Sequence, residues 1–244
     1  MNQILISQKI YVTKEMRRKR IIYKTLYLLS IISIIALLLY YVLAEKDRNE
    51  QEALSQEILD SFVAHEDQTT VEETSIVFAL NENNEDESQE IQQIEVIEEN
   101  HNTPAPSQVS TSNGQTYSTE ARLKFPKLNI DYPILSEESE ALLKVSLCKY
   151  WGPTPNEVGN YCIVGHNYKS GKMFGKLSMA EVGDQVTLTG LDGKTVTYQI
   201  YNIYVVEPTD VSCTSQLTNG KRELTLITCT NYGKQRLVVK AREV

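Results

Sequence analysis

Hydrophobic and polar residues alternate most clearly near the carboxyl end of the chain. Residues 222–229 follow a period of two and are rich in β-branched types, which is typical of a strand rather than a helix. The strand ends at Cys229, a turn cluster follows at residues 230–233, and residues 236–240 predict a second strand. A hairpin of these two strands would place Arg236 beside Cys229. Because a nearby cation favours a thiolate and can hold an oxyanion, Cys229 is a candidate nucleophile. The alternative is an ordinary buried thiol.

The same pattern predicts further short strands upstream of that hairpin. Apolar and β-branched runs predict a helix at residues 137–145 and strands at 121–125, 128–134, 161–164, 185–189 and 195–206. Asp192 and Gly193 are expected to form the turn of a hairpin. Many short strands separated by turns predict an all-β domain, either a barrel or a sandwich.

One histidine ends a predicted strand, as Cys229 does. The chain has three histidines, and two of them, His65 and His101, lie in polar, acidic sequence. His166 instead follows the apolar run 161–164 and a glycine. It therefore lies at the carboxyl end of a predicted buried strand, where a rigid sheet can present a side chain to a cleft. His166 is the candidate base, and the alternative is a histidine satisfied within the core.

The amino-terminal pattern is different, because residues 25–43 are 19 consecutive residues without a charge. As a helix this run would measure about 28 Å at roughly 1.5 Å per residue, enough to cross a membrane. Residues 1–24 carry seven Lys or Arg against one acid, and such a flank stays in the cytoplasm. We expect a single-pass cell-membrane anchor with a cytoplasmic amino terminus and an extracellular carboxyl-terminal domain. A cleaved signal peptide is the alternative, but its apolar core is usually shorter.

Charge divides the rest of the chain near residue 117. The net charge of the chain is -8, and residues 45–116 hold 18 acids against two basic residues, without Trp or Tyr. Such a segment buries too little apolar surface to offset its ordering entropy. Residues 44–116 therefore predict a largely disordered stalk, with a helix possible only in parts such as 51–62. Residues 117–244 hold 15 basic and 13 acidic residues, and a domain of this size can bury one core.

Three sequence elements together point to a family. The run TLITC ends at Cys229 and is followed by an arginine in RLVV, while a strand ending in Gly-His, with MFGKL just beyond it, comes earlier. In this order and spacing they resemble the sortases, the cysteine transpeptidases of Gram-positive cell surfaces, over about residues 121–244. The resemblance implies an eight-stranded β-barrel with short helices, in which His166, Cys229 and Arg236 converge and residues 207–220 wall a peptide groove. The tight link from Cys229 to Arg236, without a long helical insertion or a lid motif, fits a class D or related subclass.

The resemblance also implies a reaction. The Cys229 thiolate would attack the threonine carbonyl of an LPXTG-like sorting signal and form a thioester. His166 would protonate the departing amine and later deprotonate the incoming one. Arg236 would hydrogen-bond the oxyanion, and Thr228 would contact the substrate through its backbone or hydroxyl. The acceptor would be an amine of a cell-wall precursor or of peptidoglycan. No metal or organic cofactor is needed, and no nucleic acid partner is expected.

Other functions stay open at this point. If the acceptor is a lysine of another surface protein, the chain is a pilin-polymerising sortase. A non-enzymatic, membrane-tethered adhesion or sensor barrel would have the same anchor and stalk, but no reason to keep the three residues together in space. L,D-transpeptidases and papain-like hydrolases fit poorly, because the former place a different run before the cysteine and the latter place the cysteine before the histidine.

The four cysteines raise the question of disulfides. Cys229 has to be reduced to act, and Cys148 and Cys162 fit small core positions. Cys213 lies in a predicted loop. We therefore expect no structural disulfide.

Overall fold

The computed structural model describes residues 13–72 and 105–244 of the chain. The chain divides into two compact units at the bond between Glu50 and Gln51. The predictions that fall outside the described residues concern residues 1–12, the stalk between 73 and 104, His101 and the side chain of His65.

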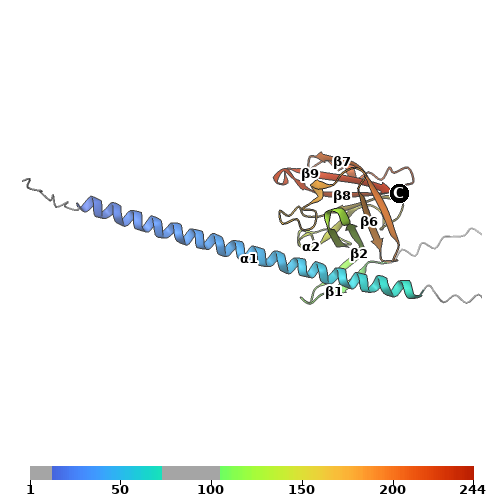
Figure 1. Ribbon diagram of the computed structural model, residues 1–244, viewed down its shortest axis with the longest axis horizontal. Helices are drawn as coiled ribbons and strands as arrows, with labels where there is room; N and C mark the ends of the chain where they lie inside the picture. The colour runs from blue at the N-terminus through green and yellow to red at the C-terminus, as the bar shows by residue number, and fades with distance from the viewer. Residues whose placement is uncertain (1–12, 73–104) are drawn as a thin grey trace, which may run out of the picture. The chain divides into compact units, whose positions relative to one another are not determined.

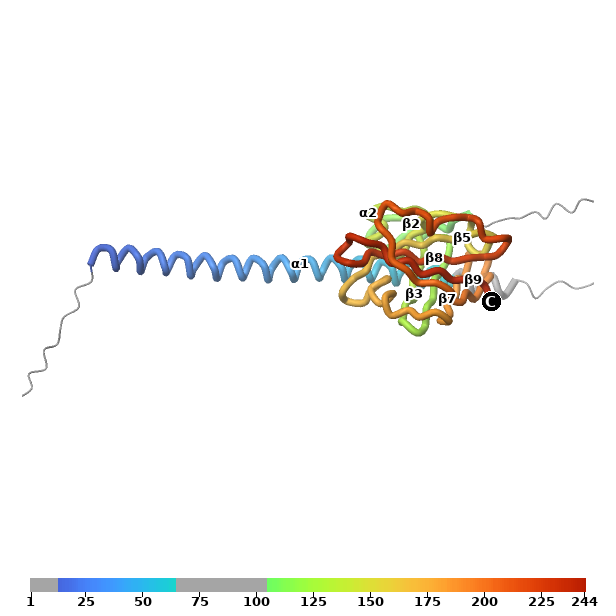
Figure 2. The backbone as a smooth tube through the Cα atoms, turned by 90° about the horizontal axis from the view of Figure 1, so that it is seen from above, coloured from blue at the N-terminus to red at the C-terminus, as the bar shows by residue number. Residues whose placement is uncertain are grey.

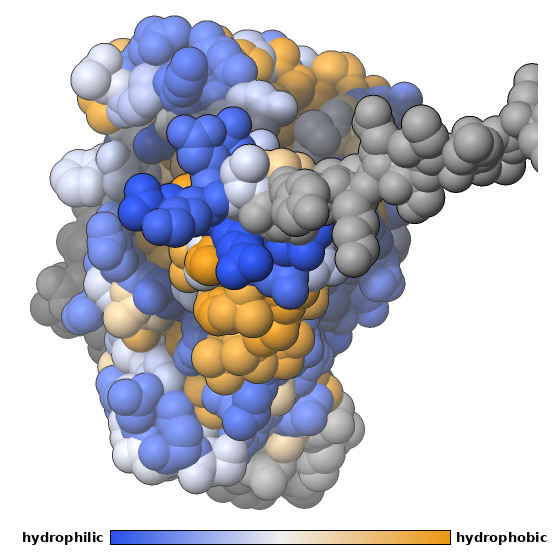
Figure 3. Space-filling model, turned by 90° about the vertical axis from the view of Figure 1, so that its left-hand side faces the viewer, coloured by the Kyte–Doolittle hydropathy of each residue, from blue (hydrophilic) through white to orange (hydrophobic). Residues whose placement is uncertain are grey.

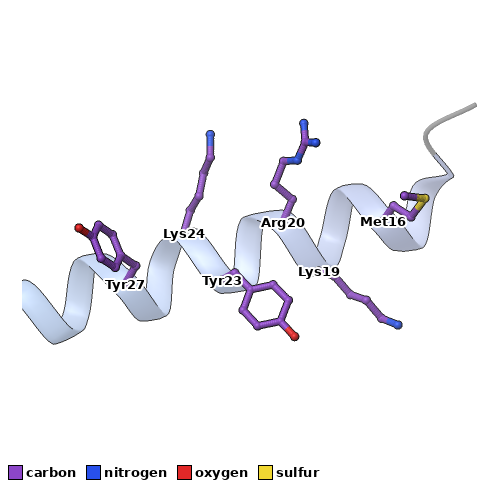
Figure 4. A pocket seen from close by; sticks show the side chains of 6 residues that line it. All are labelled: Met16, Lys19, Arg20, Tyr23, Lys24 and Tyr27. Atoms are coloured by element: carbon purple, nitrogen blue, oxygen red, sulfur yellow. The ribbon is translucent and has the colours of Figure 1, made fainter. Parts of the chain in front are cut away.

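The first unit is built on α1 (Lys14–Glu72), a helix that continues into the second unit. Among the described residues, one helix is long and apolar enough to cross a membrane, and none of its most apolar stretch is buried. Figure 3 shows hydrophobic side chains gathered at this end of the chain beside a hydrophilic cluster. Near the start of α1, Arg20 and Lys24 extend to one side of the helix and Tyr23 to the other (Figure 4). An exposed apolar helix beside a basic flank is consistent with a single-pass membrane anchor.

The second unit contains a closed barrel, which eight strands form within the described residues (Figure 1). Their order around the barrel is β2-β3-β4-β5-β8-β9-β7-β6, and the pairing of β2 with β6 closes the ring. The pairs β3–β4 and β5–β8 are parallel, and the other pairs are antiparallel. The predicted eight-stranded all-β barrel is thus confirmed. The strands are β2 (Thr116–Phe125), β3 (Ile130–Leu135), β4 (Leu147–Trp151), β5 (Gly159–Val164), β6 (Gln185–Gly190), β7 (Thr195–Val206), β8 (Arg222–Thr230) and β9 (Gln235–Glu243).

Short elements extend or connect the barrel strands. β1 (Ser107–Ser110) pairs with the first half of β2, and α2 (Glu140–Val145) precedes β4. The side chain of Ser139 accepts a hydrogen bond from the Leu142 N–H, so this cap starts α2 later than the sequence pattern predicts. The sequence pattern missed β1 and β4, because both are short and only partly buried. The 3-10 turns of the described region are η1 (Pro126–Leu128), η2 (Leu177–Met179), η3 (Ser212–Thr214) and η4 (Asn231–Gly233).

The part of α1 in the second unit packs against the barrel, at the segment 51–62 where the sequence left a helix open within the predicted stalk. Ile58, Leu59 and Phe62 are buried. Ile58 belongs to an outer apolar cluster with Tyr117, Leu135, Val145 and Cys148. The composition of the acidic segment does not predict this contact, because a few apolar residues at helical spacing are enough to bury one face of the helix. The domain boundaries themselves stay a prediction.

The barrel interior holds the main core, so alternate side chains of each strand face outward. In β8, Leu226 belongs to the interior core. Its neighbour Ile227 joins a small outer cluster with Cys162 and Cys213. Cys229 lies two residues after Ile227 in the same strand and therefore shares its outward face. The barrel presents this cysteine on its outer surface.

All four cysteines are free thiols in the structure. Cys148 and Cys162 are fully buried, as predicted for core residues. Burial raises the pKa of each of these two thiols to about 12, so neither forms a thiolate at neutral pH. Cys213 lies in η3 and is buried against the outer cluster.

Candidate active site

The hairpin of β8 and β9 brings Cys229 and Arg236 together. These two residues are direct partners in the antiparallel register, as the sequence predicts. The turn between the strands is tight, with Asn231 and Tyr232 in the left-handed region at φ 48° and 55° and Gly233 at φ 84°. Non-glycine residues seldom adopt this conformation. The strained turn permits the short link between the cysteine and the arginine.

The turn also orients the guanidinium of Arg236. Its Nη1 donates to the carbonyl oxygen of Gly233 at 3.0 Å and to that of Gln235 at 3.2 Å. A guanidinium carries five N–H donors, and the turn carbonyls use those of Nη1. Arg236 and Cys229 are both half-buried, so a ligand in the pocket can reach them.

His166 reaches the same region from the end of β5. It follows Gly165, where a Cβ atom would lie 2.4 Å from Cδ2 of Leu147, so any larger residue here would force the buried Leu147 side chain to shift. The Gly165 N–H donates to the Ile227 carbonyl at 3.2 Å. The Thr228 hydroxyl donates to the Gly165 carbonyl at 2.7 Å. These two bonds fasten the end of β5, and thus His166, to β8.

Thr228 lines the pocket, but the residue as a whole is only 1% exposed. Its hydroxyl is already bonded to the carbonyl of Gly165. The side chain therefore supports the strand pairing, and its hydroxyl is not free for the substrate contact that the sequence predicts.

The loop after β5 folds back toward Cys229. The side-chain amide of Asn167 donates to the Cys229 carbonyl at 2.8 Å, and the Asn167 backbone forms an isolated β-bridge with Met173. The Phe174 N–H donates to the His166 carbonyl at 3.0 Å. His166 is thus held beside the cysteine strand from both sides. Sequence reasoning missed Asn167, whose only signal was its position next to His166.

The residues predicted for the site line one pocket on the outer face of the barrel. The pocket measures about 260 Å³ and contains His166, Thr228, Cys229 and Arg236. Figure 2 shows β8 and β9, which carry the last three, running side by side. The apolar walls come from α2, the nearby strands and the loop between β7 and β8, through Leu143, Tyr150, Val164, Val206, Val211 and Ile227.

The loop between β7 and β8, residues 207–221, forms one wall of the pocket. Asn160, which is fully buried in β5, donates through its side-chain amide to the carbonyls of Cys213 at 2.8 Å and Ser215 at 3.1 Å. The Thr225 hydroxyl in turn donates to the Asn160 carbonyl oxygen Oδ1 at 2.6 Å. A buried amide with satisfied partners fixes its surroundings. The loop that forms this wall of the pocket is therefore anchored to the barrel.

The electrostatic setting of His166 favours its neutral form. Burial lowers the pKa of the imidazole, and the positive charge of Lys144 lowers it further. The ring of Tyr168 lies 5.1 Å from the His166 ring, centroid to centroid, at an angle of 47°. A lowered pKa leaves most of the imidazole neutral at neutral pH, and that form can accept a proton.

Replacing Lys144 by Gln is expected to raise the pKa of His166, because the substitution removes a cation that disfavours the imidazolium. Lys144 is exposed, so added salt should shrink the difference between variant and parent. The measurement is an NMR titration of the imidazole signals, and the chain has only three histidines to resolve. Lys194→Gln, in the turn between β6 and β7, is the matched control. An unchanged or lower pKa of His166 in Lys144→Gln would contradict this account.

Comparisons with known proteins find a match that covers the carboxyl-terminal half of the chain. The family model of the sortase domain matches residues 123–244, which is half of the chain. A search of curated proteins found no match.

Among solved structures, the chain is similar to sortases of three classes. Sortase A from Corynebacterium diphtheriae shares 27% identity over 52% of this chain and 61% of its own chain, with a TM-score of 0.48. A Clostridium perfringens sortase D5 transpeptidase shares 27% identity over 52% and 79%, with a TM-score of 0.47. Sortase C-1 from Actinomyces oris shares 27% identity over 51% and 73%, with a TM-score of 0.47. The chain spans 61% of the length of the first of these, and the subclass stays open. By its family match, the chain belongs to the sortase family.

Proposed function

We propose that this protein is a membrane-anchored cysteine transpeptidase that cleaves an LPXTG-like sorting signal after threonine and transfers the product to an amine of the cell wall. The observation that carries the proposal is the single pocket in which His166, from the end of β5, meets Cys229 and Arg236 of the β8–β9 hairpin. Membership in the sortase family supports it. A non-enzymatic barrel would have no need to combine a thiol, an imidazole and a guanidinium in one cleft.

The reacting state is formed when neutral His166 takes the proton of the Cys229 thiol, which gives a thiolate and an imidazolium. In the first half of the reaction, this thiolate attacks the threonine carbonyl, forming a carbon–sulfur bond and a tetrahedral oxyanion. Collapse of this intermediate breaks the bond from threonine to glycine, and the departing amine takes a proton from the His166 imidazolium. In the second half, neutral His166 accepts a proton from the incoming amine, which attacks the thioester. The sulfur leaves as a thiolate. One amide bond is broken and one is formed, so the cycle returns the enzyme to its starting state.

Arg236 supplies the positive charge for the oxyanion. It lies directly across from Cys229 in the hairpin, and the carbonyls of Gly233 and Gln235 hold its Nη1 in place. Donors that are ordered before the reaction stabilise developing charge without reorganisation. The hydroxyl of Thr228 is already bonded to Gly165, so a substrate contact at this position would have to use the backbone of a residue that is only 1% exposed without a peptide.

The walls of the pocket suit a peptide whose residues before threonine are apolar. Leu143, Val164 and Ile227 supply apolar surface beside the reacting groups. Pockets of this composition bind through apolar contact and use a few polar groups for orientation. The leucine and proline of an LPXTG-like signal would occupy the apolar part and present the threonine carbonyl to Cys229.

We place residues 1–24 in the cytoplasm, 25–43 in the membrane, 44–116 in a stalk and 117–244 in an extracellular catalytic domain of class D-like or related type. The apolar stretch of α1, none of which is buried, supports the membrane assignment. The basic flank supports the orientation, because positively charged segments stay on the cytoplasmic side.

The test is incubation of the full-length chain, in detergent and under reducing conditions, with a library of LPXTG-like peptides. Mass spectrometry should detect the peptide fragment ending in threonine as a thioester on Cys229. No adduct with any peptide would overturn the proposal and leave a tethered adhesion or sensor barrel. Adding a cell-wall-type amine or a lysine-bearing pilin peptide then identifies the acceptor. Faster consumption of the adduct by the lysine peptide would indicate a pilin-polymerising sortase instead.

A further inference from the structure

Carboxylates on α1 bond to the barrel at two places. The Tyr132 hydroxyl donates to Oε1 of Glu52 at 2.7 Å. The backbone N–H and the hydroxyl of Ser112 both donate to the carboxylate of Glu57, each at 2.8 Å. Both carboxylates lie within the second unit, where α1 runs along the barrel past β1 (Figure 1). Glu52 accepts one hydrogen bond and Glu57 accepts two, and the two residues lie little more than one helical turn apart, but their contacts lead to different parts of the fold.

The Glu52 contact continues toward the loop that carries His166. The Tyr132 hydroxyl, whose proton goes to Glu52, accepts a hydrogen bond from the Met173 N–H at 3.1 Å. Met173 forms the isolated β-bridge with Asn167. The next residue, Phe174, donates its N–H to the His166 carbonyl. Two hydrogen bonds, the peptide bond from Met173 to Phe174 and a third hydrogen bond therefore join α1 to the backbone of the candidate base. The Glu57 contact ends instead on the turn between β1 and β2.

Met173 needs such support because its backbone is strained. It adopts the left-handed region at φ 50°, which is uncommon for a residue other than glycine, and it is only 2% exposed. Strained residues persist where their surroundings hold them in place. A buried N–H that lost its acceptor would be costly. The oxygen of Tyr132 is that acceptor.

Glu52 sets the direction of the Tyr132 hydroxyl. A phenol has one proton to donate, and when Glu52 takes it, the oxygen lone pairs are free to face the Met173 N–H. Tyr132 is buried, and burial raises the pKa of its phenol, so the hydroxyl keeps its proton. Without the carboxylate, the hydroxyl can rotate and turn its proton toward Met173.

We propose that Glu52 is a positioning residue for His166. It orients the Tyr132 hydroxyl, which holds Met173 and thereby the loop of residues 166–174. The helix that carries the membrane anchor is in this way coupled to the reacting groups. The catalytic consequence rests on the proposed function, whereas the ordering of the loop does not.

The first experiment measures loop order without any substrate. Hydrogen exchange of the full-length chain in detergent, read on peptides covering residues 166–177, should be roughly fivefold faster in Glu52→Ala, as expected for one lost hydrogen bond. Glu52→Gln keeps an oxygen acceptor and should exchange like the parent. Glu57→Ala is the matched control, because it removes a similar α1 contact that does not lead to the loop. Equal acceleration in Glu57→Ala, or none in Glu52→Ala, would overturn the proposal.

The second experiment measures acylation of Cys229 by a reactive peptide. Glu52→Ala should lower kcat roughly fivefold with little change in KM, and Glu52→Gln should restore it. In a Tyr132→Phe background, Glu52→Ala should add nothing, because the hydroxyl through which it acts is gone. An additive loss in the double variant, or an unchanged kcat in Glu52→Ala, would overturn the positioning role. If none of the peptides acylates Cys229 of the parent, the proposed function fails. The exchange measurement still decides whether Glu52 orders the loop.

Discussion

Replacing Cys229 by alanine is expected to abolish acylation and transfer, with a loss of roughly 10⁴-fold or more. Alanine offers no nucleophile, and the reaction proposed here begins with a bond to the sulfur. The fold should survive, since the side chain is half-buried at the end of β8 and the bond from Asn167 goes to the backbone carbonyl. The measurement is single-turnover acylation followed by mass spectrometry, with thermal unfolding recorded on the same sample.

A matched control for this variant is Cys148→Ala. Cys148 is a buried free thiol that belongs to the outer cluster beside α1 and does not line the pocket. It should lose some stability, because its sulfur is packed, and keep the adduct on Cys229. An adduct on the Cys229→Ala variant at the parental rate would contradict the assignment of the nucleophile.

The hairpin that carries Cys229 and Arg236 could be predicted from the sequence because its determinants are local. Alternating β-branched residues set the two strands, and the turn residues between them leave little freedom of register. The structure pairs the two residues directly. The approach of His166 is a long-range feature and follows instead from the order of the sequence elements shared with the family.

The contacts that hold the site in place could not be predicted in the same way. Glu52 lies in an acidic segment whose composition indicates a stalk, yet its carboxylate meets Tyr132, which is 80 residues away in the chain. The direction of the Thr228 hydroxyl depends on a carbonyl of another strand. No periodic pattern encodes such partners, because a polar side chain can bond to whatever tertiary neighbour the fold supplies.

Replacing Arg236 by alanine is expected to lower kcat by roughly 10²- to 10³-fold, the usual cost of losing a charged oxyanion donor. KM should change much less, because the interaction is made mainly in the transition state. Arg236→Lys should recover only a small part of the rate. An ammonium is a point charge on a flexible stem, and it cannot both bond the carbonyls of Gly233 and Gln235 and present further donors in a fixed plane.

Arg242→Ala is the matched control for Arg236, since it removes an arginine from the outward face of the same strand. Arg242 pairs with Glu223 and lies outside the pocket, so kcat should stay at the parental level. Full activity in Arg236→Lys, or an equal loss in Arg242→Ala, would contradict the proposed role.

The pH dependence of kcat separates the role of Arg236 from that of His166. A guanidinium stays charged across the working pH range, so the loss in Arg236→Ala should be the same at each pH. A loss that varied with pH would instead mean that the substitution disturbs proton transfer by the imidazole.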